Sequence, residues 1–298
     1  MKRRSEVVFW LALQRAFHNQ PLISNELLTI YGAPSEIFKA VRSMKADNGP
    51  ITGLKNFNQW EKCEDDLKRC EKDGIDIIRL DDPRYPPLLK EIAARPILLM
   101  AKGDTGLLKG PCISIVGARK ATSRGREVAF EIARELAKIG IIVVSGMAYG
   151  IDAASHLGAI ETGKTVAVWG SGIDCCYPSS FRDLSQRIMK SGCVISEFPL
   201  GTQPFPGHFP QRNRIISGLS TGTVIVEAAS KSGSLITAKF ALEQGREVFA
   251  VPGMAGGTMS QGTNDLLRNG ATFVENAEDV IAAIAPQLTF VSNDNKGH

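Results

Sequence analysis

The residues with the clearest chemical meaning are cations and small polar residues that follow apolar stretches in the second part of the chain. The cations are Arg119, Lys120, Arg124, Arg212, Arg214 and Lys231, and the neutral donors near them are Ser145, Asn213, Ser232 and Ser234. Many residues around them are glycine or proline, and small residues let backbone N–H groups approach a ligand. Carboxylates nearby are few, mainly Asp152, Asp174, Glu197 and Glu227. This combination is typical of a phosphate-binding site, with Arg119 and Lys231 as its best candidates.

A regular alternation of strand-like and helical segments is what would bring these residues together. The apolar, strand-like runs are 113–117, 141–146, 165–172, 194–198, 223–229 and 247–253. Fully apolar strands that alternate with helices form a parallel sheet covered on both faces, so the fold class is α/β. Ligands of such folds bind beyond the carboxyl ends of the strands. The loops that follow the six runs, and the polar residues in them, should therefore meet at one edge of the sheet.

Each of these features also has a plain structural interpretation. A glycine-rich loop can be only a tight turn, and a single arginine at a strand end is usually a solvated charge. Asp152 fits an N-cap as well as it fits a ligand role. The convergence of several cations at one edge, rather than any one of them, favours an anion site.

Four aromatic residues interleave with the same loops: Tyr149, Tyr177, Phe205 and Phe209. Aromatic faces beside a basic groove stack the bases of single-stranded nucleic acid without sequence readout, at roughly 1–3 kcal/mol per base. The alternative is that these rings wedge the loops against the sheet edge. Because Tyr177 and Phe209 each precede a proline, we favour the wedge for those two.

The chain divides into four segments. Residues 1–72 look like a small all-helical domain, in which Ser24 and Ser35 could cap helices and Gly32 could end one. Residues 73–110 hold two short apolar runs around a turn-rich DDPRYPPLL stretch, and we treat them as a connector packed on the core. Residues 111–285 form the α/β domain, and 286–298 are expected to be a flexible tail.

Composition excludes several classes of protein without selecting one. The 298 residues are 43% hydrophobic and 22% charged, as in ordinary globular proteins, and carry a net charge of +4. The six cysteines show no CxxC pair and are too sparse for a secreted disulfide scaffold, so reduced thiols in a cytoplasm are expected. No apolar run approaches the ~18 residues of a membrane span. The start of the chain is an amphipathic helix rather than a signal peptide, since no small-residue cleavage site follows it.

Motifs that would support catalysis or a cofactor are missing or misplaced. Residues 158–165, GAIETGKT, match a phosphate-binding P-loop by letter. They would end a helix and lead into a strand, whereas a P-loop follows a strand and opens a helix, so we reject the match and interpret Gly163 as a helix stop. No dinucleotide fingerprint follows the first strand, the histidines and cysteines show no metal spacing, and His156 is better explained as structural than as catalytic. The sequence therefore predicts a non-enzymatic binding protein without cofactor or metal.

Long, ordered motifs in the α/β segment resemble the DNA-processing protein A family (DprA, also called Smf). The motifs are SIVGARKATSRG, VVSGMAYGIDAASHLGAI, VAVWGSGIDCCYP, ISEFPLGTQPFPGHFPQRNRIISGLS, VIVEAASKSGSLITAKFALEQGREVFAVPG and GTNDLLRNGA. The connector DDPRYPPLL and the stretch LLTIYGAPSEIFKA are also similar to the family. The resemblance implies an extended Rossmann-like fold with a mainly parallel sheet, preceded by a small all-helical SAM-like domain.

The resemblance also implies a function and a set of contacts. The function is binding of single-stranded DNA (ssDNA), protection of incoming strands during natural transformation, and loading of the recombinase RecA, with single-strand-binding protein as a further partner. It implies a cytoplasmic homodimer with no membrane association. The DNA or phosphate contacts are expected at Gly117, Arg119, Lys120, Arg124, Ser145, Gly146, Arg212, Asn213, Arg214, Lys231, Ser232, Gly233 and Ser234. Three phosphate-binding cations, Arg119, Arg214 and Lys231, would then hold the strand.

Three departures from the family pattern, and one competing function, stay open at this point. Tyr149 stands where the family often has an arginine, Cys175 and Cys176 have no assigned role, and no counterpart of the C-terminal winged-helix-like domain of many members follows the last helix. The competing function is a nucleotide sensor or nucleotide hydrolase of the related Rossmann-like superfamily. Those hydrolases carry a PGGxGTxxE loop, whereas the aligned stretch here reads EAASKSGSLITA, which favours binding. Loss of nucleotide hydrolysis in a Glu227→Ala variant would instead favour the enzyme.

Overall fold

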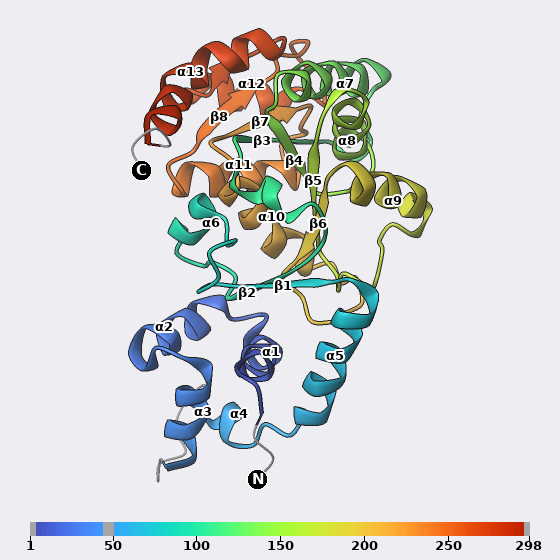
Figure 1. Ribbon diagram of the computed structural model, residues 1–298. Coiled ribbons are helices and arrows are strands. Elements are labelled where there is room, and N and C mark those ends of the chain that lie inside the picture. The colour runs from blue at the N-terminus through green and yellow to red at the C-terminus, as the bar shows by residue number, and fades with distance from the viewer. Residues whose placement is uncertain (1–3, 44–50, 295–298) are drawn as a thin grey trace.

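The computed structural model describes residues 4–43 and 51–294, and a nine-stranded sheet is its central feature (Figure 1). The strand order is β1-β2-β6-β5-β4-β3-β7-β8-β9. The strands are β1 (Asp76–Arg79), β2 (Leu98–Gly103), β3 (Cys112–Gly117), β4 (Ile142–Ser145), β5 (Thr165–Trp169), β6 (Cys193–Ser196), β7 (Gly222–Val226), β8 (Glu247–Ala250) and β9 (Thr272–Phe273). All pairs from β6 to β9 are parallel, and each of the six expected core strands is present.

The apolar runs form this sheet because both of its faces are buried. On β3, Ile113 and Ile115 belong to the apolar cluster on one face, while Cys112 and Val116 belong to the cluster on the other. This alternation is the period-two geometry of a strand, and with both faces covered it gives a continuous apolar run. The sheet therefore carries an apolar core on each side.

Helices cover the two faces, as Figure 1 shows. One face packs against α7 (Ser123–Lys138), α8 (Ile151–Thr162) and α13 (Ala277–Asp294), and the other against α6 (Pro87–Glu91), α10 (His208–Gly218) and α11 (Ser234–Glu243). The remaining elements of the core are η1 (Thr105–Lys109), η2 (Ser179–Phe181), α9 (Arg182–Ser191) and α12 (Gln261–Arg268). Gly158 lets α7 and α8 pack closely, because a Cβ there would lie 2.1 Å from the carbonyl oxygen of Phe130.

The segment 73–110 contributes two strands to the sheet. β1 pairs antiparallel with β2, and β2 pairs antiparallel with β6, with Met100 opposite Ser196. Both apolar runs of the expected connector are thus strands, and they extend the parallel sheet by an antiparallel edge. That edge lies between the helical domain and the rest of the α/β domain (Figure 1).

The N-terminal domain is all-helical, but the two helices expected to be capped by Ser24 and Ser35 begin earlier, at Pro21 and Pro34. Its helices are α1 (Glu6–Phe17), α2 (Pro21–Tyr31), α3 (Pro34–Ser43), α4 (Thr52–Lys55) and α5 (Trp60–Asp73). Ser24 and Ser35 lie inside α2 and α3, so the two predicted caps are wrong. Proline takes the first helical position because its missing N–H has no partner to lose there. Gly32 does end α2, with φ near 80° and its N–H donated to Leu28 O.

The expected tail after residue 285 is also wrong over most of its length. Helix α13 continues to Asp294. The first glycine after Gly270 is Gly297, so the usual helix-ending residue is absent from this stretch. Residues 295–298 lie outside the described part of the chain.

Candidate functional site

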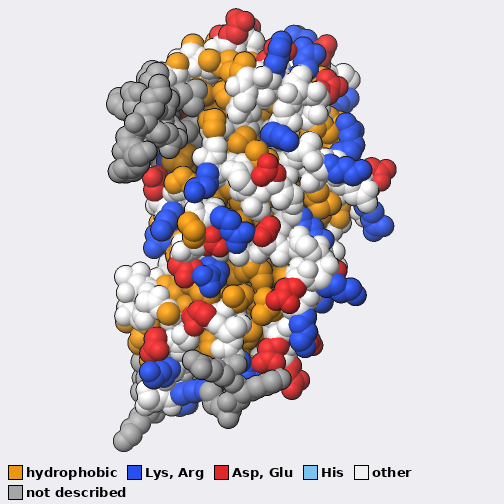
Figure 2. All heavy atoms as spheres, viewed as in Figure 1, with side chains coloured by type: hydrophobic (Ala, Val, Ile, Leu, Met, Phe, Trp, Pro, Cys, Tyr) orange, Lys and Arg blue, Asp and Glu red, His pale blue; other side chains and the backbone are white. Residues whose placement is uncertain are grey.

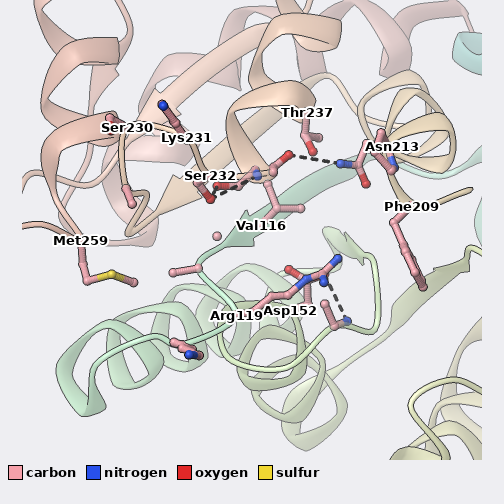
Figure 3. A pocket seen from close by; sticks show the side chains of 18 of the residues that line it. Val116, Arg119, Asp152, Phe209, Asn213, Ser230, Lys231, Ser232, Thr237 and Met259 are labelled. Atoms are coloured by element: carbon pink, nitrogen blue, oxygen red, sulfur yellow. Dashed lines mark hydrogen bonds between the residues drawn. The ribbon is translucent and has the colours of Figure 1, made fainter. Parts of the chain in front are cut away.

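A pocket of about 560 Å³ opens at the carboxyl ends of β3 and β7, where the loops after several core strands meet (Figure 3). Its lining includes nine of the predicted contact residues: Gly117, Arg119, Lys120, Arg212, Asn213, Lys231, Ser232, Gly233 and Ser234. They come from the β3–α7 loop, the first turns of α10, and the loop that leads into α11. The sheet topology thus brings together side chains that are up to 117 residues apart in sequence, from Gly117 to Ser234.

Arg212 lies at the buried side of this pocket and differs from its other cations, Arg119, Lys120 and Lys231, in being almost fully buried. Its side chain donates to the carbonyl oxygens of Gly146, at 2.6 Å, and of Val168, and its Nε donates to Asn213 Oδ1 at 3.2 Å. Those acceptors are neutral, and burial lowers the pKa of Arg212 to about 10 although Asp152 opposes the shift. At neutral pH the guanidinium remains charged, so the pocket contains a poorly hydrated positive charge that an anion can stabilise.

Asp152 is buried beside Arg212 in the first turn of α8. Its Oδ2 accepts from Ala148 N at 3.3 Å, and Gly150 holds the N-cap position, so the N-cap interpretation of Asp152 is wrong. Burial raises the pKa of the Asp152 carboxyl, while Arg212 and Arg119 favour its charged form. Gly146 makes room for both groups, since a Cβ there would lie 2.5 Å from the Arg212 guanidinium and 2.7 Å from Asp152 Oδ2. Gly146 therefore supports the pocket without lining it.

The exposed cations stand at the mouth of the pocket. Arg119, Lys120 and Lys231 are all exposed, and the Arg119 guanidinium lies 5.4 Å from the centre of the Phe209 ring. This cation–π contact orients Arg119 over the pocket. Figure 2 shows positive and negative side chains interspersed over the face it presents.

The N-terminus of α11 completes the pocket with neutral donors. Ser232 Oγ lies 2.7 Å from Ser234 Oγ, and Asn213 Nδ2 donates to Gly233 O at 3.3 Å (Figure 3). A Cβ on Gly233 would meet nothing within 4 Å, and its φ of −62° suits any residue. The fold therefore does not require glycine at 233, whereas close approach of a ligand would. The N-terminal end of α11 is electropositive and adds to the affinity for anions.

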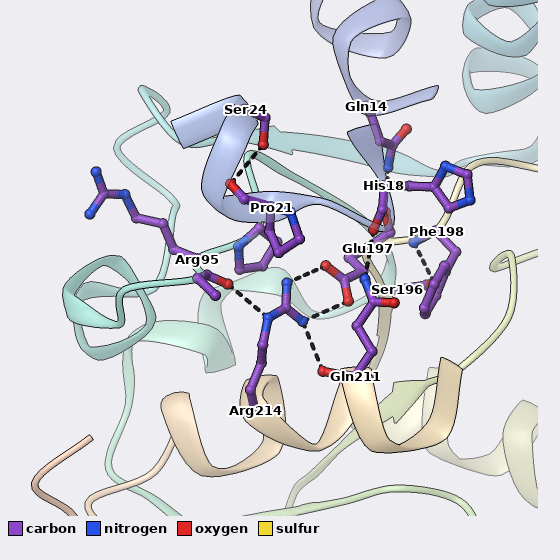
Figure 4. A network of polar contacts seen from close by, with 12 residues as sticks. Gln14, His18, Pro21, Ser24, Arg95, Ser196, Glu197, Phe198, Gln211 and Arg214 are labelled. Carbon is purple, nitrogen blue, oxygen red and sulfur yellow. Dashed lines mark hydrogen bonds and ion pairs between the residues drawn. The ribbon is translucent and has the colours of Figure 1, made fainter. Parts of the chain in front are cut away.

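Arg214 does not reach the pocket, which contradicts its expected role in holding phosphate. Its guanidinium forms a buried, two-pronged ion pair with Glu197, at 2.7 and 2.5 Å, and donates to Ala94 O and Gln211 O (Figure 4). Residues two apart on a helix point about 200° apart, so α10 can direct only one of Arg212 and Arg214 towards the pocket.

Two further predicted contacts also lie elsewhere. Ser145 is fully buried in β4 and donates to Ile115 O at 2.7 Å, so its hydroxyl serves the sheet. Arg124 is exposed on α7, forms an ion pair with Glu127 at 2.9 Å, and lines a different pocket. Gly117 lines the main pocket, but β7 alone requires a glycine there, because a Cβ would lie 1.8 Å from Val226 O.

The aromatic residues lie beside the pocket and are only partly packed. Tyr149, Tyr177 and Phe205 are 50%, 48% and 61% exposed, and the Tyr177 and Phe209 rings lie 5.6 Å apart. Tyr149, Tyr177 and Phe209 line a smaller recess that shares Arg119 and Arg212 with the main pocket. Phe209 lies under the Arg119 guanidinium, whereas Tyr177 is about half exposed.

The helical domain contacts the loop after β6 and the first turn of α10, which carries Phe209. Gln14 Nε2 donates to Glu197 O and Gln211 Nε2 donates to His18 O, each at 2.6 Å (Figure 4). Arg15 and Asp66 form a buried ion pair within the helical domain, and Arg69 pairs with Asp174 across the junction at 2.9 Å. Sequence reasoning missed this connection because Gln14 belongs to no recognisable motif, and the motif that contains Gln211 does not indicate a partner in the helical domain.

Other pocket residues were missed although their loops were identified. Met259 belongs to the loop after β8, and Thr237 lies one helical turn after Ser234. The turn relationship between Ser234 and Thr237 is a usable signal, since residues three apart on a helix share a face. Met259 has no such signal.

The rejected P-loop match has the expected location. Residues 158–165 run from the last turns of α8, through its C-cap Gly163, to the first residue of β5. Within residues 4–43 and 51–294, no group of three or more His, Cys, Asp or Glu side chains is arranged to hold a metal ion. The six cysteines are free, and Cys175 accepts from Gln203 Nε2 at 3.4 Å. No helix of the described chain is long and apolar enough to cross a bilayer.

The fold and the pocket define a class: an α/β protein with an extended Rossmann-like sheet and a cation-lined pocket at its carboxyl edge. Comparison with known proteins identifies the family. Residues 76–285 match the family described as DNA recombination-mediator protein A, and the chain belongs to this family.

Individual relatives agree with this assignment. The chain is 44% identical to the DNA processing protein DprA of Bacillus subtilis over 72% of this chain and 73% of that protein. It is 36% identical to the protein Smf of Escherichia coli over 78% of this chain and 65% of that protein.

Two solved structures have the same fold. DprA from Streptococcus pneumoniae superposes with a TM-score of 0.79 at 33% identity, covering 95% of this chain and 98% of that one. DNA processing protein A from Helicobacter pylori, whose structure concerns its single-stranded DNA binding mode, superposes with a TM-score of 0.65 at 30% identity, covering 72% and 96%.

Proposed function

We propose that the pocket at the β3 and β7 edge binds the phosphate backbone of ssDNA. The observation that carries the proposal is the buried Arg212, hydrogen-bonded to neutral acceptors and surrounded by Arg119, Lys231 and the N-terminus of α11 in one cavity. Charge-assisted hydrogen bonds to phosphate are strong where water is excluded. The Helicobacter pylori relative supports the choice of nucleic acid, since its structure concerns binding of single-stranded DNA.

In this mechanism the protein binds DNA and does no chemistry on it. Arg119 and Lys231 each contact one backbone phosphate at the mouth of the pocket, and Arg212 with the backbone of 232–234 holds a third. The accessible faces of Tyr149 and Tyr177 stack neighbouring bases. Arg212 takes the place of Arg214 as the third cation, so the strand is still held through about three phosphates.

We further propose that the bound strand is a recombination substrate. Bound ssDNA would be protected from degradation during natural transformation and passed to RecA in the cytoplasm, with single-strand-binding protein displaced and the protein acting as a homodimer. Membership of the recombination-mediator family supports this role.

Fluorescence anisotropy with labelled single- and double-stranded oligonucleotides across a salt series tests the binding step. The single strand should bind more tightly. Its log–log salt slope should be near −2 per subunit, from about 0.7 for each of about three phosphates. Equal binding of duplex, or a flat response to salt, would overturn the proposal.

The competing nucleotide hydrolase is disfavoured by the position of Glu227. Its two carboxylate oxygens accept from Thr122 N at 2.8 Å and from Thr122 Oγ1 at 2.5 Å, and it lines a pocket other than the cation pocket. Release of base or phosphate from mononucleotides, lost in Glu227→Ala, would favour the enzyme.

A further inference from the structure

A second large pocket lies beside the first, at the carboxyl ends of β7 and β8. Its volume is about 570 Å³, and Met259 lines both pockets and so forms part of the wall between them. A strand whose phosphate occupies the first pocket therefore has a cavity large enough for a nucleobase directly beside it.

The charges of this second pocket are opposite to those of the first. It contains two carboxylates, Glu227 and Glu275, and its one cation, Arg124, forms an ion pair with Glu127. Carboxylates repel a phosphate but accept hydrogen bonds from the amino groups of bases. The pocket is thus suited to a hydrogen-bond donor and not to the backbone of the strand.

The walls suit a flat aromatic ring. The apolar lining comes from Val251, Pro252, Met254 and Met259. Met254 is 83% exposed, so it is not needed for packing of the protein core. Methionine sulfur makes favourable contacts with aromatic rings.

Glu227 is held rigidly in this pocket. Its backbone adopts φ of 55°, which non-glycine residues rarely do, and its carboxylate accepts two hydrogen bonds from Thr122. Gly125 is needed for this arrangement, because a Cβ there would lie 2.4 Å from Glu227 Cδ. Each carboxylate oxygen has a second lone pair that these bonds leave free.

We infer that this pocket is a nucleobase subsite that prefers bases with an exocyclic amino group, such as cytosine. The inference rests on the proposed binding of ssDNA in the neighbouring pocket. The base of a nucleotide next to the held phosphate enters past Met259, packs between Met254 and Pro252, and donates from its amino group to Glu227. Thymine, which has a carbonyl oxygen at the same ring position, faces the carboxylate with an acceptor.

The test compares equal-length oligonucleotides of cytosine, of thymine and of abasic deoxyribose phosphate by fluorescence anisotropy at neutral pH. Wild-type protein should bind the cytosine strand about fivefold more tightly than the thymine strand, the ratio for one net hydrogen bond. In Glu227→Gln the ratio should fall to one or below, since the amide can donate to the thymine carbonyl and can still bond Thr122. Removing a negative charge strengthens binding of every anionic strand, so the cytosine-to-thymine ratio is the readout.

Met254→Ser is a second variant that leaves the charge and the core unchanged. It should weaken the cytosine strand severalfold and leave the abasic strand unaffected. Glu278→Gln, an exposed acid outside the pocket, is the matched control and should preserve the wild-type ratio. An unchanged ratio in Glu227→Gln, or an equal loss of abasic and base-containing strands in Met254→Ser, would overturn the inference. If wild-type protein binds the abasic strand in a salt-dependent way and Arg119→Ala loses this binding, the proposed phosphate site is supported. A negative result for base preference then counts against the base subsite alone.

Discussion

Arg212 and Arg214 lie two residues apart on α10, and their guanidinium groups serve opposite sides of that helix. Arg212 donates to Gly146 O at the buried side of the cation-lined pocket, whereas Arg214 pairs with Glu197 in the loop that the helical domain contacts. Both are almost fully buried. Their surroundings differ in one respect that decides their roles: Arg214 has a carboxylate partner of its own, and the side-chain bonds of Arg212 go to neutral oxygens.

The first prediction separates the two arginines. Arg214→Met leaves Glu197 buried without its partner and should lower the free energy of unfolding by about 3–5 kcal/mol. Urea unfolding measures the loss of stability. The folded variant should keep its ssDNA affinity within about twofold, because Arg214 does not line the pocket. Adding Glu197→Gln should recover part of the loss. Weak DNA binding by a fully stable Arg214→Met protein would restore its role as a phosphate contact.

The second prediction concerns the exposed cations of the pocket. Arg119→Ala with Lys231→Ala should weaken binding of all single strands alike and reduce the log–log salt slope by about 1.4, from ~0.7 per lost phosphate contact. Anisotropy across a salt series measures both quantities. The matched control is Lys138→Ala with Lys239→Ala, which removes the same charge from exposed positions outside the pocket. Similar slopes for the two double variants would mean that overall charge, and not the pocket, governs binding.

The third prediction uses the glycine that the fold does not need. Gly233→Ala should leave stability unchanged or raise it by about 0.5 kcal/mol, because φ of −62° suits alanine and the unfolded chain loses freedom. The new methyl group would occupy the space through which a phosphate approaches the N-terminus of α11. Affinity for ssDNA should therefore fall severalfold while the melting temperature is maintained. A variant that binds like wild type would show that no ligand approaches this backbone.

The fourth prediction concerns the response of the fold to acid. His156 is fully buried, and its Nδ1 lies 2.8 Å from Thr165 Oγ1, which itself donates to Val143 O. The histidine therefore donates from Nδ1 and is neutral. Burial lowers its pKa from 6.5 to about 3, so the folded state binds fewer protons than the unfolded state between these values.

It follows that the stability supplied by neutral His156 is complete above pH 6.5 and is lost as the pH falls towards 3. The loss is about 1.4 kcal/mol per pH unit, or about 2 kcal/mol between pH 6 and pH 4.5. Urea unfolding at several pH values measures how the free energy of unfolding changes with pH. Between pH 6.5 and 3 this dependence should be weaker in His156→Gln than in wild type, by the equivalent of one proton. Parallel slopes in the two proteins would contradict this assignment.

Sequence patterns predicted the core of the fold well because the signals there are local. Each apolar run from 113 to 250 forms a strand, since burial on both faces makes most of its positions apolar. Local sequence patterns did not show that β1 and β2 belong to the same sheet. Their partners are decided by an antiparallel contact between Met100 and Ser196, and no local pattern encodes a pairing over that separation.

The candidate site was predictable to the level of its loops but not of its side-chain directions. Topology alone places the loops at one edge, and nine of the thirteen expected contacts line one pocket. The direction of Arg214 depends on where α10 begins, and the first residue of that helix, His208, lies in a glycine- and proline-rich stretch without a clear cap signal. The second pocket was missed because its defining residue, Glu227, acquires its role from the backbone turn after β7.

The pairing of β2 with β6 also determines the order in which the molecule can be built during translation. Met100 leaves the ribosome 96 residues before Ser196, as the numbering of the pair shows. At 5–20 residues per second this interval is about 5 to 20 seconds. For that time the apolar β2 has no neighbour on its β6 side, and the helical domain still waits for later sheet residues that complete its core, among them Trp169 and Val194. The newborn chain thus passes through a period in which its N-terminal third depends on segments not yet synthesised, and a chaperone that shields apolar strands would act on it then.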